Sequence, residues 1–250
     1  SSGNSSAPRG DNPQIIDATT PNLPTVITNA STGVEETNAT LHGYLQNNGS
    51  ADTTCYFLYD NDASGEPYTN NQTQNIITNH TEFQYNAESL TSGDLYYYNT
   101  KANNTAGWDN DGGEQTFFTK PEDPDSITTT STTGSTADLT IDKADMGTDA
   151  TSYTYIRYQT GNYPTNREEG TFGINTTDAS TQLTGLNPGT HYYASAWAWG
   201  EEGGKGQYSD TYITFQFNTS NTPTVITNET TGIEETNATL RGYLQNNGSA

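Results

Sequence analysis

The chain repeats itself over a long interval. Residues 24–51 read PTVITNASTGVEETNATLHGYLQNNGSA, and 199 positions later residues 223–250 read PTVITNETTGIEETNATLRGYLQNNGSA, with 24 of 28 positions identical. This period is too long for solenoid units of about 20–50 residues and fits a cassette of whole domains. The sequence therefore predicts one cassette and the opening of a second. Arrays of this kind more often build length, stiffness or multivalency than an active site.

The charge balance narrows the range of partners. The chain has 30 acidic and 8 basic residues, a formal net charge of −22. This is the opposite of the basic footprint of a nucleic-acid-binding protein, and it disfavours anionic lipid surfaces. No apolar run is long enough to cross a bilayer. We therefore expect no nucleic acid partner and no direct membrane insertion of this segment.

Aromatic residues stand in for a scarce aliphatic core. The chain has 17 Tyr and 3 Trp, and large aromatic side chains bury roughly 150–250 Å² each. Runs such as Cys55–Tyr59 and Leu95–Asn99 suit the pleated surface of strands, and no segment has a sustained helical period. About seven short strands in each of two units predict an all-β fold of tandem seven-stranded antiparallel β-sandwiches.

Four segments follow along the chain. They are a flexible or linker N-terminal segment, two sandwiches, and the first two strands of a third sandwich, at 1–22, 24–121, 125–219 and 222–250. The short linker Pro121–Pro124 is predicted to be stiff. The last segment repeats 23–51, and two strands alone are marginal in water. Either the chain continues past Ala250, or these strands complete a sheet in another copy by strand donation.

Two similar segments carry a family resemblance. The sequence LTGLNPGTHYYASA at 183–196 resembles the E–F corner and strand F of a fibronectin type III domain. In each unit a Leu precedes a Tyr by six residues, Leu90 before Tyr96 and Leu186 before Tyr192. This spacing suits a tyrosine corner, in which the hydroxyl bonds back to the turn. The resemblance implies fibronectin type III or immunoglobulin-like sandwiches in both units.

Strand B departs from that family pattern. Fibronectin type III domains usually place a core Trp there, whereas this chain has Ile141 in the second unit and Leu41 or Leu45 in the first. The departure loosens the subfamily assignment but leaves the prediction of a sandwich unchanged.

Asn-X-Ser/Thr sequons favour an exported chain. They matter only on a glycosylating export route, and the alternative is that a chain rich in Thr and Asn forms them by accident. The cassette and its GVEETNATLHGYL phrase also resemble repeat units of archaeal cell-surface proteins, which implies an extracellular location and covalent N-glycans. The twelve candidate acceptors are Asn4, Asn29, Asn38, Asn48, Asn71, Asn79, Asn103, Asn175, Asn218, Asn228, Asn237 and Asn247.

The three tryptophans are candidates for stacking on a sugar. Trp197 and Trp199 alternate along a predicted strand, so their side chains share a face, and Trp108 lies in the first unit. The alternative is that one ring lies in a core and another in a contact between domains.

Three short motifs that contain Asp are candidates for ligand binding. Asp109, Asp111 and Glu114 lie on a Gly-rich turn that could bind Ca²⁺, and Asp60–Asp62 forms a second acidic turn. Asp, Asn and Gly also form turns for their own conformational reasons. The tripeptide Arg9–Asp11 reads RGD, which some fibronectin-like proteins display to integrins and which also arises by chance.

No catalytic constellation stands out. His42, His80 and His191 have no metal-ligand spacing, and the repeat places Arg241 where His42 stands. The single cysteine, Cys55, excludes an internal disulfide and is expected to be a small buried hydrophobe. We therefore expect a protein that is not an enzyme and requires no cofactor.

The sequence favours a structural role. We expect an extracellular repeat protein that forms a cell-surface filament, sheath, S-layer element or adhesin stalk through contacts with copies of itself. The alternative is a set of carbohydrate- or ligand-binding or spacer domains of a larger secreted adhesin or enzyme.

Overall fold

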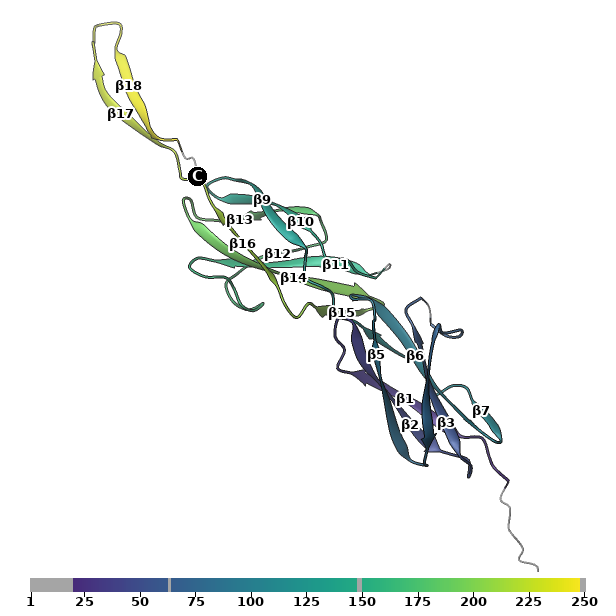
Figure 1. Cartoon of the computed structure of the whole chain (residues 1–250). Helices are drawn as coiled ribbons and strands as arrows, with labels where there is room; N and C mark the ends of the chain where they lie inside the picture. The colour runs from purple at the N-terminus through teal and green to yellow at the C-terminus, as the bar shows by residue number, and fades with distance from the viewer. Residues whose placement is uncertain (1–19, 63, 148–149, 248–250) are drawn as a thin grey trace, which may run out of the picture.

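The chain forms three β units arranged end to end. The computed structural model describes residues 20–62, 64–147 and 150–247, and these contain strands and no helix. Figure 1 shows the units in a row, with β1–β8 first, β9–β16 next and the hairpin β17–β18 last. Within the described residues no helix has the length and apolarity that a membrane span needs.

The first unit is a sandwich of two antiparallel sheets. One sheet has the order β1-β2-β5, and the other has the order β4-β3-β6-β7, with β8 also paired to β6. Its strands are β1 (Thr25–Thr32), β2 (Asn38–Asn47), β3 (Thr53–Asp60), β4 (Asn70–Ile77), β5 (Thr81–Glu88), β6 (Leu95–Asn104), β7 (Gly107–Asp109) and β8 (Gln115–Phe118).

The second unit repeats this topology. Its sheets have the orders β9-β10-β13 and β12-β11-β14-β15, with β16 also paired to β14. Its strands are β9 (Ser126–Thr132), β10 (Thr136–Asp142), β11 (Thr151–Gln159), β12 (Thr171–Thr176), β13 (Ser180–Thr184), β14 (His191–Glu202), β15 (Lys205–Tyr208) and β16 (Ile213–Asn218). The predicted all-β tandem sandwiches are confirmed.

The last strand position of each sandwich is divided into two pieces. In the first unit β7 pairs with residues 102–104 of β6, and β8 pairs with residues 95–98 of the same strand. In the second unit the sequence predicts one strand over 208–218, but β15 and β16 are separate strands along β14. The loops between the pieces interrupt the ladder but still bond to it, with the Gly112 N–H donating to the Thr100 carbonyl and the Ser209 N–H donating to the Ala198 carbonyl. Seven strand positions therefore contain eight strands.

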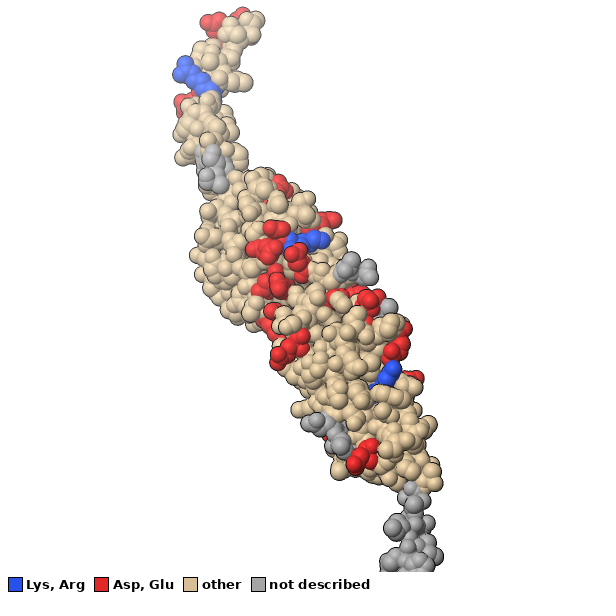
Figure 2. Space-filling model, turned by 45° about the vertical axis from the view of Figure 1, so that its right-hand side comes forward, with Lys and Arg blue, Asp and Glu red and all other residues tan. Residues whose placement is uncertain are grey.

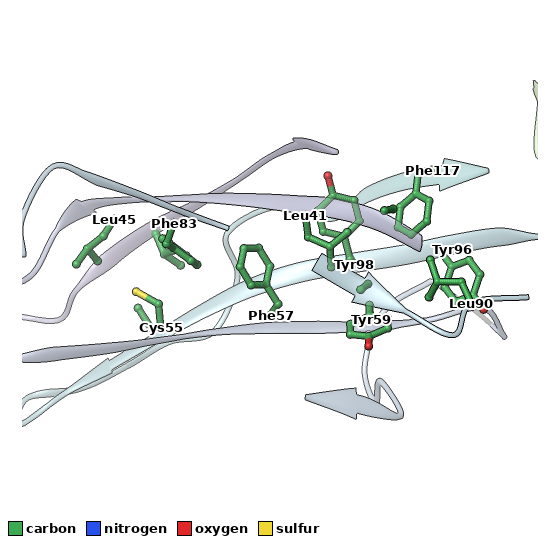
Figure 3. Close-up of a cluster of buried hydrophobic side chains, with 14 residues drawn as sticks. Leu41, Leu45, Cys55, Phe57, Tyr59, Phe83, Leu90, Tyr96, Tyr98 and Phe117 are labelled. Carbon is green, nitrogen blue, oxygen red and sulfur yellow. The ribbon is translucent and has the colours of Figure 1, made fainter. Parts of the chain in front are cut away.

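Alternating side chains fill the space between the sheets (Figure 3). Leu41 and Leu45 are fully buried on β2, and Ile141 is buried at the corresponding strand of the second unit. The Phe57 and Phe83 rings face each other across the first core with centroids 5.0 Å apart. Aromatic rings thus supply the core volume that the scarce aliphatic residues do not.

A tyrosine holds the corner before the sixth strand position in both units. The Tyr96 hydroxyl accepts the backbone N–H of Thr91 at 2.9 Å, and the Tyr192 hydroxyl accepts that of Asn187 at 2.9 Å. Each bond spans five residues and ties strand β6 or β14 to the turn that precedes it. This is the hydrogen bond that defines a tyrosine corner.

The third unit is a hairpin that copies the first two strands of the chain. It consists of β17 (Thr224–Thr231) and β18 (Thr239–Asn246). Val225 pairs with Leu244 here, as Val26 pairs with Leu45 in the first sandwich. Identical registers place the same side chains on the same face of both hairpins.

Candidate functional sites: a domain joint, an open hairpin and an aromatic hollow

The two sandwiches meet where apolar side chains of the first pack against glycine backbone of the second. Phe118 ends β8 and is 1% exposed, and Leu95 begins β6 and is 4% exposed. A Cβ on Gly200 would lie 2.9 Å from two ring carbons of Phe118 and 3.1 Å from the sulfur of Met146. A Cβ on Gly203 would lie 2.8 Å from Leu95. Glycine therefore allows the turn of β14–β15 to approach the first sandwich closely, and we call this contact the joint.

Polar bonds surround this apolar contact. Lys120 bridges the two sandwiches, with its ammonium 2.6 Å from Glu35 of the first and 2.7 Å from Asp210 of the second. Burial lowers the pKa of Lys120, but the two carboxylates outweigh it and raise the pKa overall. Further hydrogen bonds cross the joint or fasten its linker; they are Gln207 to the Phe118 carbonyl, Lys205 to the Thr116 carbonyl, Thr211 to Asp123, the Leu95 N–H to Glu202, and the Gly147 N–H to the Gly93 carbonyl.

Acidic side chains concentrate beside the joint. Figure 2 shows Asp and Glu gathered over the middle of the molecule on this face. Burial raises the pKa of Glu36, and the charges of Glu122, Asp123 and Asp210 raise it further. Lys120 contacts Asp210, and Arg167 lies near the same carboxylate, but the acidic groups outnumber these cations, so the joint carries excess negative charge at neutral pH.

The far end of the second sandwich is built differently. Leu95 and Phe118 face each other across β6 and β8, and His191 and Asn218 occupy the corresponding positions across β14 and β16. The His191 ring bonds Asn218 at 2.7 Å. Where the first sandwich offers an apolar pair to its neighbour, the second therefore offers a polar pair.

The hairpin β17–β18 exposes side chains that belong inside a sandwich. The side chains that are buried in β1–β2 are open to solvent in the copy, although sequence and register match. The exposed fractions rise from 3% at Val26 to 68% at Val225, from 0% at Leu41 to 82% at Leu240, and from 0% at Leu45 to 56% at Leu244. Within the part of the chain that the structure describes, the open hairpin thus carries the side chains of one half of a sandwich core.

Trp108 lines a shallow hollow on the outer face of the first sandwich. Its ring is 45% exposed, and its centroid lies 5.2 Å from that of Tyr56, across strand β6. Beside the rings is a hollow of about 190 Å³. The lining residues are Tyr56, Leu58, Asn71, Lys101, Trp108 and Asn110. An exposed aromatic face with polar neighbours is suited to a small ring that has one apolar side.

The other two tryptophans lie under neighbouring side chains. Trp197 and Trp199 share the outer face of β14, as predicted, while Ala194 and Ala196 enter the sandwich core. Trp197 is only 2% exposed, and its centroid lies 5.0 Å from that of Tyr212. Because no face of Trp197 is open, it is unsuited to sugar stacking.

Trp199 belongs to a small stack of rings and a cation. Its centroid lies 4.5 Å from that of Tyr208, and the Arg167 guanidinium lies 4.2 Å from the Tyr208 centroid. Such cation–π contacts stabilise a folded surface without a ligand. Trp108 is therefore the tryptophan with the most accessible ring.

The carboxylates of the predicted Ca²⁺ turn bind groups of the protein. Asp109 accepts the Val26 N–H, and Asp111 accepts the Asn99 amide and the Gly113 N–H. Glu114 accepts the Tyr68 hydroxyl and the Gly65 N–H. These bonds explain the acidic turn by local structure, and no group of three potential metal ligands occurs within the described residues. Calcium binding here stays a prediction.

The second acidic turn and the cysteine are partly or wholly buried. Asp60 is 1% exposed and accepts the Thr69 N–H, and burial raises its pKa. Cys55 is fully buried, and burial raises the pKa of its thiol to about 12. The thiol stays protonated at neutral pH, which removes its nucleophilic form.

The histidines belong to separate local settings. His42 bonds the Thr32 hydroxyl at 2.7 Å on the outer face of β1–β2, and His191 bonds Asn218. His80 sits at an exposed turn with φ 57°. The three rings do not converge on one another.

Most predicted glycosylation sites lie at accessible positions, and their modification stays a prediction. Asn4 and the RGD tripeptide Arg9–Asp11 lie outside the described residues. The half-buried acceptors are Asn29, Asn38, Asn48 and Asn103. The exposed acceptors are Asn71, Asn79, Asn175, Asn218, Asn228, Asn237 and Asn247.

The N-terminal segment is attached to the first sandwich at its end. The Asn22 N–H donates to the Gly49 carbonyl at 2.9 Å, and the Asn104 amide donates to the Asn22 carbonyl at 2.7 Å. The described part of the predicted linker therefore docks on the sandwich before β1 begins.

Several solved structures are similar to this chain. A two-domain fibronectin type III segment of chicken tenascin matches with 17% identity and a TM-score of 0.42, covering 79% of this chain and 100% of its own. The FN1–FN3 domains of chicken CNTN1 match with 15% identity and a TM-score of 0.35, covering 80% of this chain and 69% of their own.

A third similar structure is bacterial. The short sensor domain of the anti-sigma factor RsgI4 of Pseudobacteroides cellulosolvens matches with 15% identity and a TM-score of 0.30, covering 39% of this chain and 95% of its own. No protein-family model and no curated protein sequence matches the chain. The strand order and the two tyrosine corners describe the chain as tandem fibronectin type III-like sandwiches.

Proposed function

We propose that this chain is part of an extracellular structural repeat protein whose two-sandwich cassettes form a cell-surface filament, sheath, S-layer element or adhesin stalk. The observation that carries the proposal is the joint. Phe118 and Lys120 connect the sandwiches through buried apolar and ionic contacts, which oppose bending between them. A stiff pair of domains repeated along a chain keeps a fixed length and direction. A structural protein needs this property, and catalysis does not.

We propose further that copies of the chain associate head to tail. The hairpin β17–β18 supports this, because it repeats a sandwich's first strand pair, whose Leu240 and Leu244 positions normally pack against a second sheet. A second copy offers a sandwich whose β1–β2 hairpin has nearly the same sequence. Donation of 223–250 to such a copy would bury these side chains and lengthen the array.

An extracellular location fits the surface of the molecule. A net charge of −22 keeps neighbouring copies solvated and apart except where specific contacts form. Exposed sequons on both sandwiches and on the open hairpin offer places for covalent N-glycans. We propose that such glycans cover the sides of the array.

Electron microscopy of the native material tests this proposal. A ten-residue strand such as β6 is about 33 Å long at ~3.3 Å per residue, so two sandwiches with their loops span about 70–80 Å. We expect filaments or layers with an axial repeat near this length. Dispersed particles with freely varying angles between the sandwiches would contradict the proposal.

Two neighbouring substitutions test the role of the open hairpin. Leu240→Asp places a charge on its apolar face, and we expect it to abolish end-to-end association measured by light scattering. Arg241→Asp is the matched control, because the next strand residue faces the opposite side. Equal association of both variants would exclude donation of this face.

The hollow beside Trp108 favours a second candidate function, binding of a carbohydrate by a spacer or adhesin domain. The exposed Trp108 ring and the polar Asn110 are the supporting observations. A glycan array probed with the chain and with Trp108→Ala tests it. Binding that depends on Trp108 would favour this function, and signals that are equal for both proteins would refute it.

A further inference from the structure

We propose that the hollow beside Trp108 is a docking site for the first sugar of an N-linked glycan carried by Asn71 of the same chain. The inference rests on the proposed exported, glycosylated protein and adds to it a specific contact between sugar and protein. Asn71 begins the sequon Asn71-Gln72-Thr73 and is exposed on strand β4. Its side chain lines the hollow itself.

Strand pairing brings the acceptor and the aromatic rings to one face. Asn71 lies opposite Leu58 in the pairing of β3 with β4, and Tyr56 lies two residues before Leu58 on the same face. Tyr56 in turn lies opposite Lys101 of β6. Residues opposite each other in a sheet have neighbouring side chains, so the hollow spans adjacent strands between Asn71 and Trp108.

The size and polarity of the hollow match one sugar ring. Its volume of about 190 Å³ is below the ~300–1,000 Å³ of pockets that hold drug-sized ligands. A pyranose has one face of C–H groups that can cover the exposed Trp108 ring, and hydroxyl and amide groups at its edge. Asn110 and Lys101 are the polar groups at the rim, and Lys101 is held 2.6 Å from Glu66.

Covalent attachment makes a weak contact effective. A sugar that meets an aromatic ring gains little free energy from solution, but a short tether raises its local concentration to the millimolar range. The glycan would cover apolar ring surface at a favourable ~25 cal/mol per Å². The sugar needs only to fold back from Asn71 over its own strand.

Asn103 provides an internal comparison. It lies on the same sheet, directly opposite Trp108 in the pairing of β6 with β7, and it also begins a sequon. Asn103 is half-buried and does not line the hollow. A sugar on Asn103 would therefore extend from the same face without filling the hollow.

The test uses the full chain secreted from yeast and trimmed enzymatically to single N-acetylglucosamine residues. Mass spectrometry gives the occupancy of each sequon, and acrylamide quenching of tryptophan fluorescence measures the access to Trp108. Two variants each remove the sequon. Asn71→Gln replaces the acceptor, and Thr73→Ala replaces the hydroxyl residue and leaves Asn71 in place. Asn103→Gln is the matched control.

We expect a sugar on Asn71 and a protected Trp108. Removal of the Asn71 sequon should raise the quenching constant of the exposed tryptophan by about twofold or more, because a stacked sugar covers the ring surface that the Tyr56 ring leaves open. Asn103→Gln should leave quenching unchanged. The same comparison is made in a Trp108→Phe background. There the quenching constants of the trimmed proteins with and without the Asn71 sequon should be equal.

Two results would overturn the inference. One is an unmodified Asn71 in a chain whose other sequons carry sugars, and the other is a modified Asn71 with quenching equal to that of Asn71→Gln. Either result leaves the structural function intact, since the axial repeat is measured separately. A chain without sugar at any sequon would refute both this inference and the proposed glycan cover.

Discussion

Substitution of Gly200 by Val should open the joint without unfolding either sandwich. Gly200 lies in β14, opposite Ser152 and Gln207, where a β-branched residue suits the strand. Its missing side chain makes room for Phe118 and Met146 of the joint. A Cβ there would lie 2.9 Å from the Phe118 ring, closer than atoms can approach without movement.

The cost falls on the contact between the domains. The Met146 side chain can move aside, but Phe118 is 1% exposed and has no free space. Overpacking of this kind costs about 1–3 kcal/mol. If the cost acts on the joint alone, the open arrangement becomes roughly 5- to 150-fold more populated.

Distance measurement between spin labels follows this change. Cysteines introduced at the exposed positions Glu82 and Thr214 carry one label on each sandwich. The buried Cys55, with its pKa raised to about 12, stays unlabelled because its thiolate is scarce. We expect a narrow distance distribution in the parent protein and a broad one in Gly200→Val.

A matched control separates the joint from the strand. Glu201→Val adds the same side chain at the next, exposed residue of β14, and its distribution should stay narrow. An unchanged, narrow distribution in a folded Gly200→Val protein would refute the reasoning. The contact of Phe118 and Met146 with the Gly200 backbone would then not determine the angle between the sandwiches.

Three further predictions address the corner, the joint and its charge. Tyr192→Phe removes the bond to the Asn187 N–H, which should cost about 1–3 kcal/mol of unfolding free energy; calorimetry that shows no shift for the second sandwich would contradict this. Lys120→Met should broaden the distance distribution, and more strongly at low salt, because it leaves the carboxylates unpaired; insensitivity to salt would argue against this charge effect. Glu36→Gln should raise stability at pH 7, because the folded state holds the Glu36 proton more tightly than the unfolded chain. The gain should fade as the pH falls through the raised pKa and vanish below the ordinary value of 4.5; denaturant titrations that show the same gain at pH 4 and pH 7 would oppose the assignment.

Strand patterns in the sequence predicted the sandwiches because local chemistry and global fold agree there. The run Cys55–Tyr59 is continuously apolar and aromatic, and it lies in a central strand that pairs with Leu95–Asn104. The sequence does not predict the short strand β7, because Gly107–Asp109 has a turn-forming composition. It becomes a strand only because β6 extends far enough to pair with it.

The joint could not be read from the sequence. Phe117 and Phe118 are adjacent aromatics of one strand, yet Phe117 enters the core of the first sandwich and Phe118 meets the second. Both residues are Phe, and the alternation of side chains along a strand predicts only that they lie on opposite faces of the sheet. Which face receives a neighbouring domain depends on Met146 and Gly200, which lie on distant loops and strands.

The tryptophans show the same limit for a site. Alternation predicted that Trp197 and Trp199 share a face, but Tyr212 and Tyr208 cover them through contacts that the spacing does not reveal. Trp108 remains open because the strand β7 at the edge of its sheet is only three residues long. Whether a ring is exposed thus depends on the strands and side chains beside it. These neighbours are known only from the folded structure.

The path of the chain through each sandwich has a mechanical consequence. In Figure 1 the chain enters the first sandwich at one end and leaves it at the other, and its strands run lengthwise between them. Tension applied along the chain therefore pulls β1 parallel to its partner β2, and the ladder from Thr25 to Thr32 is loaded in shear. Hydrogen bonds loaded together must break together, whereas a ladder pulled from its side opens one bond at a time. The first sandwich is thus oriented to resist tension applied between its two ends.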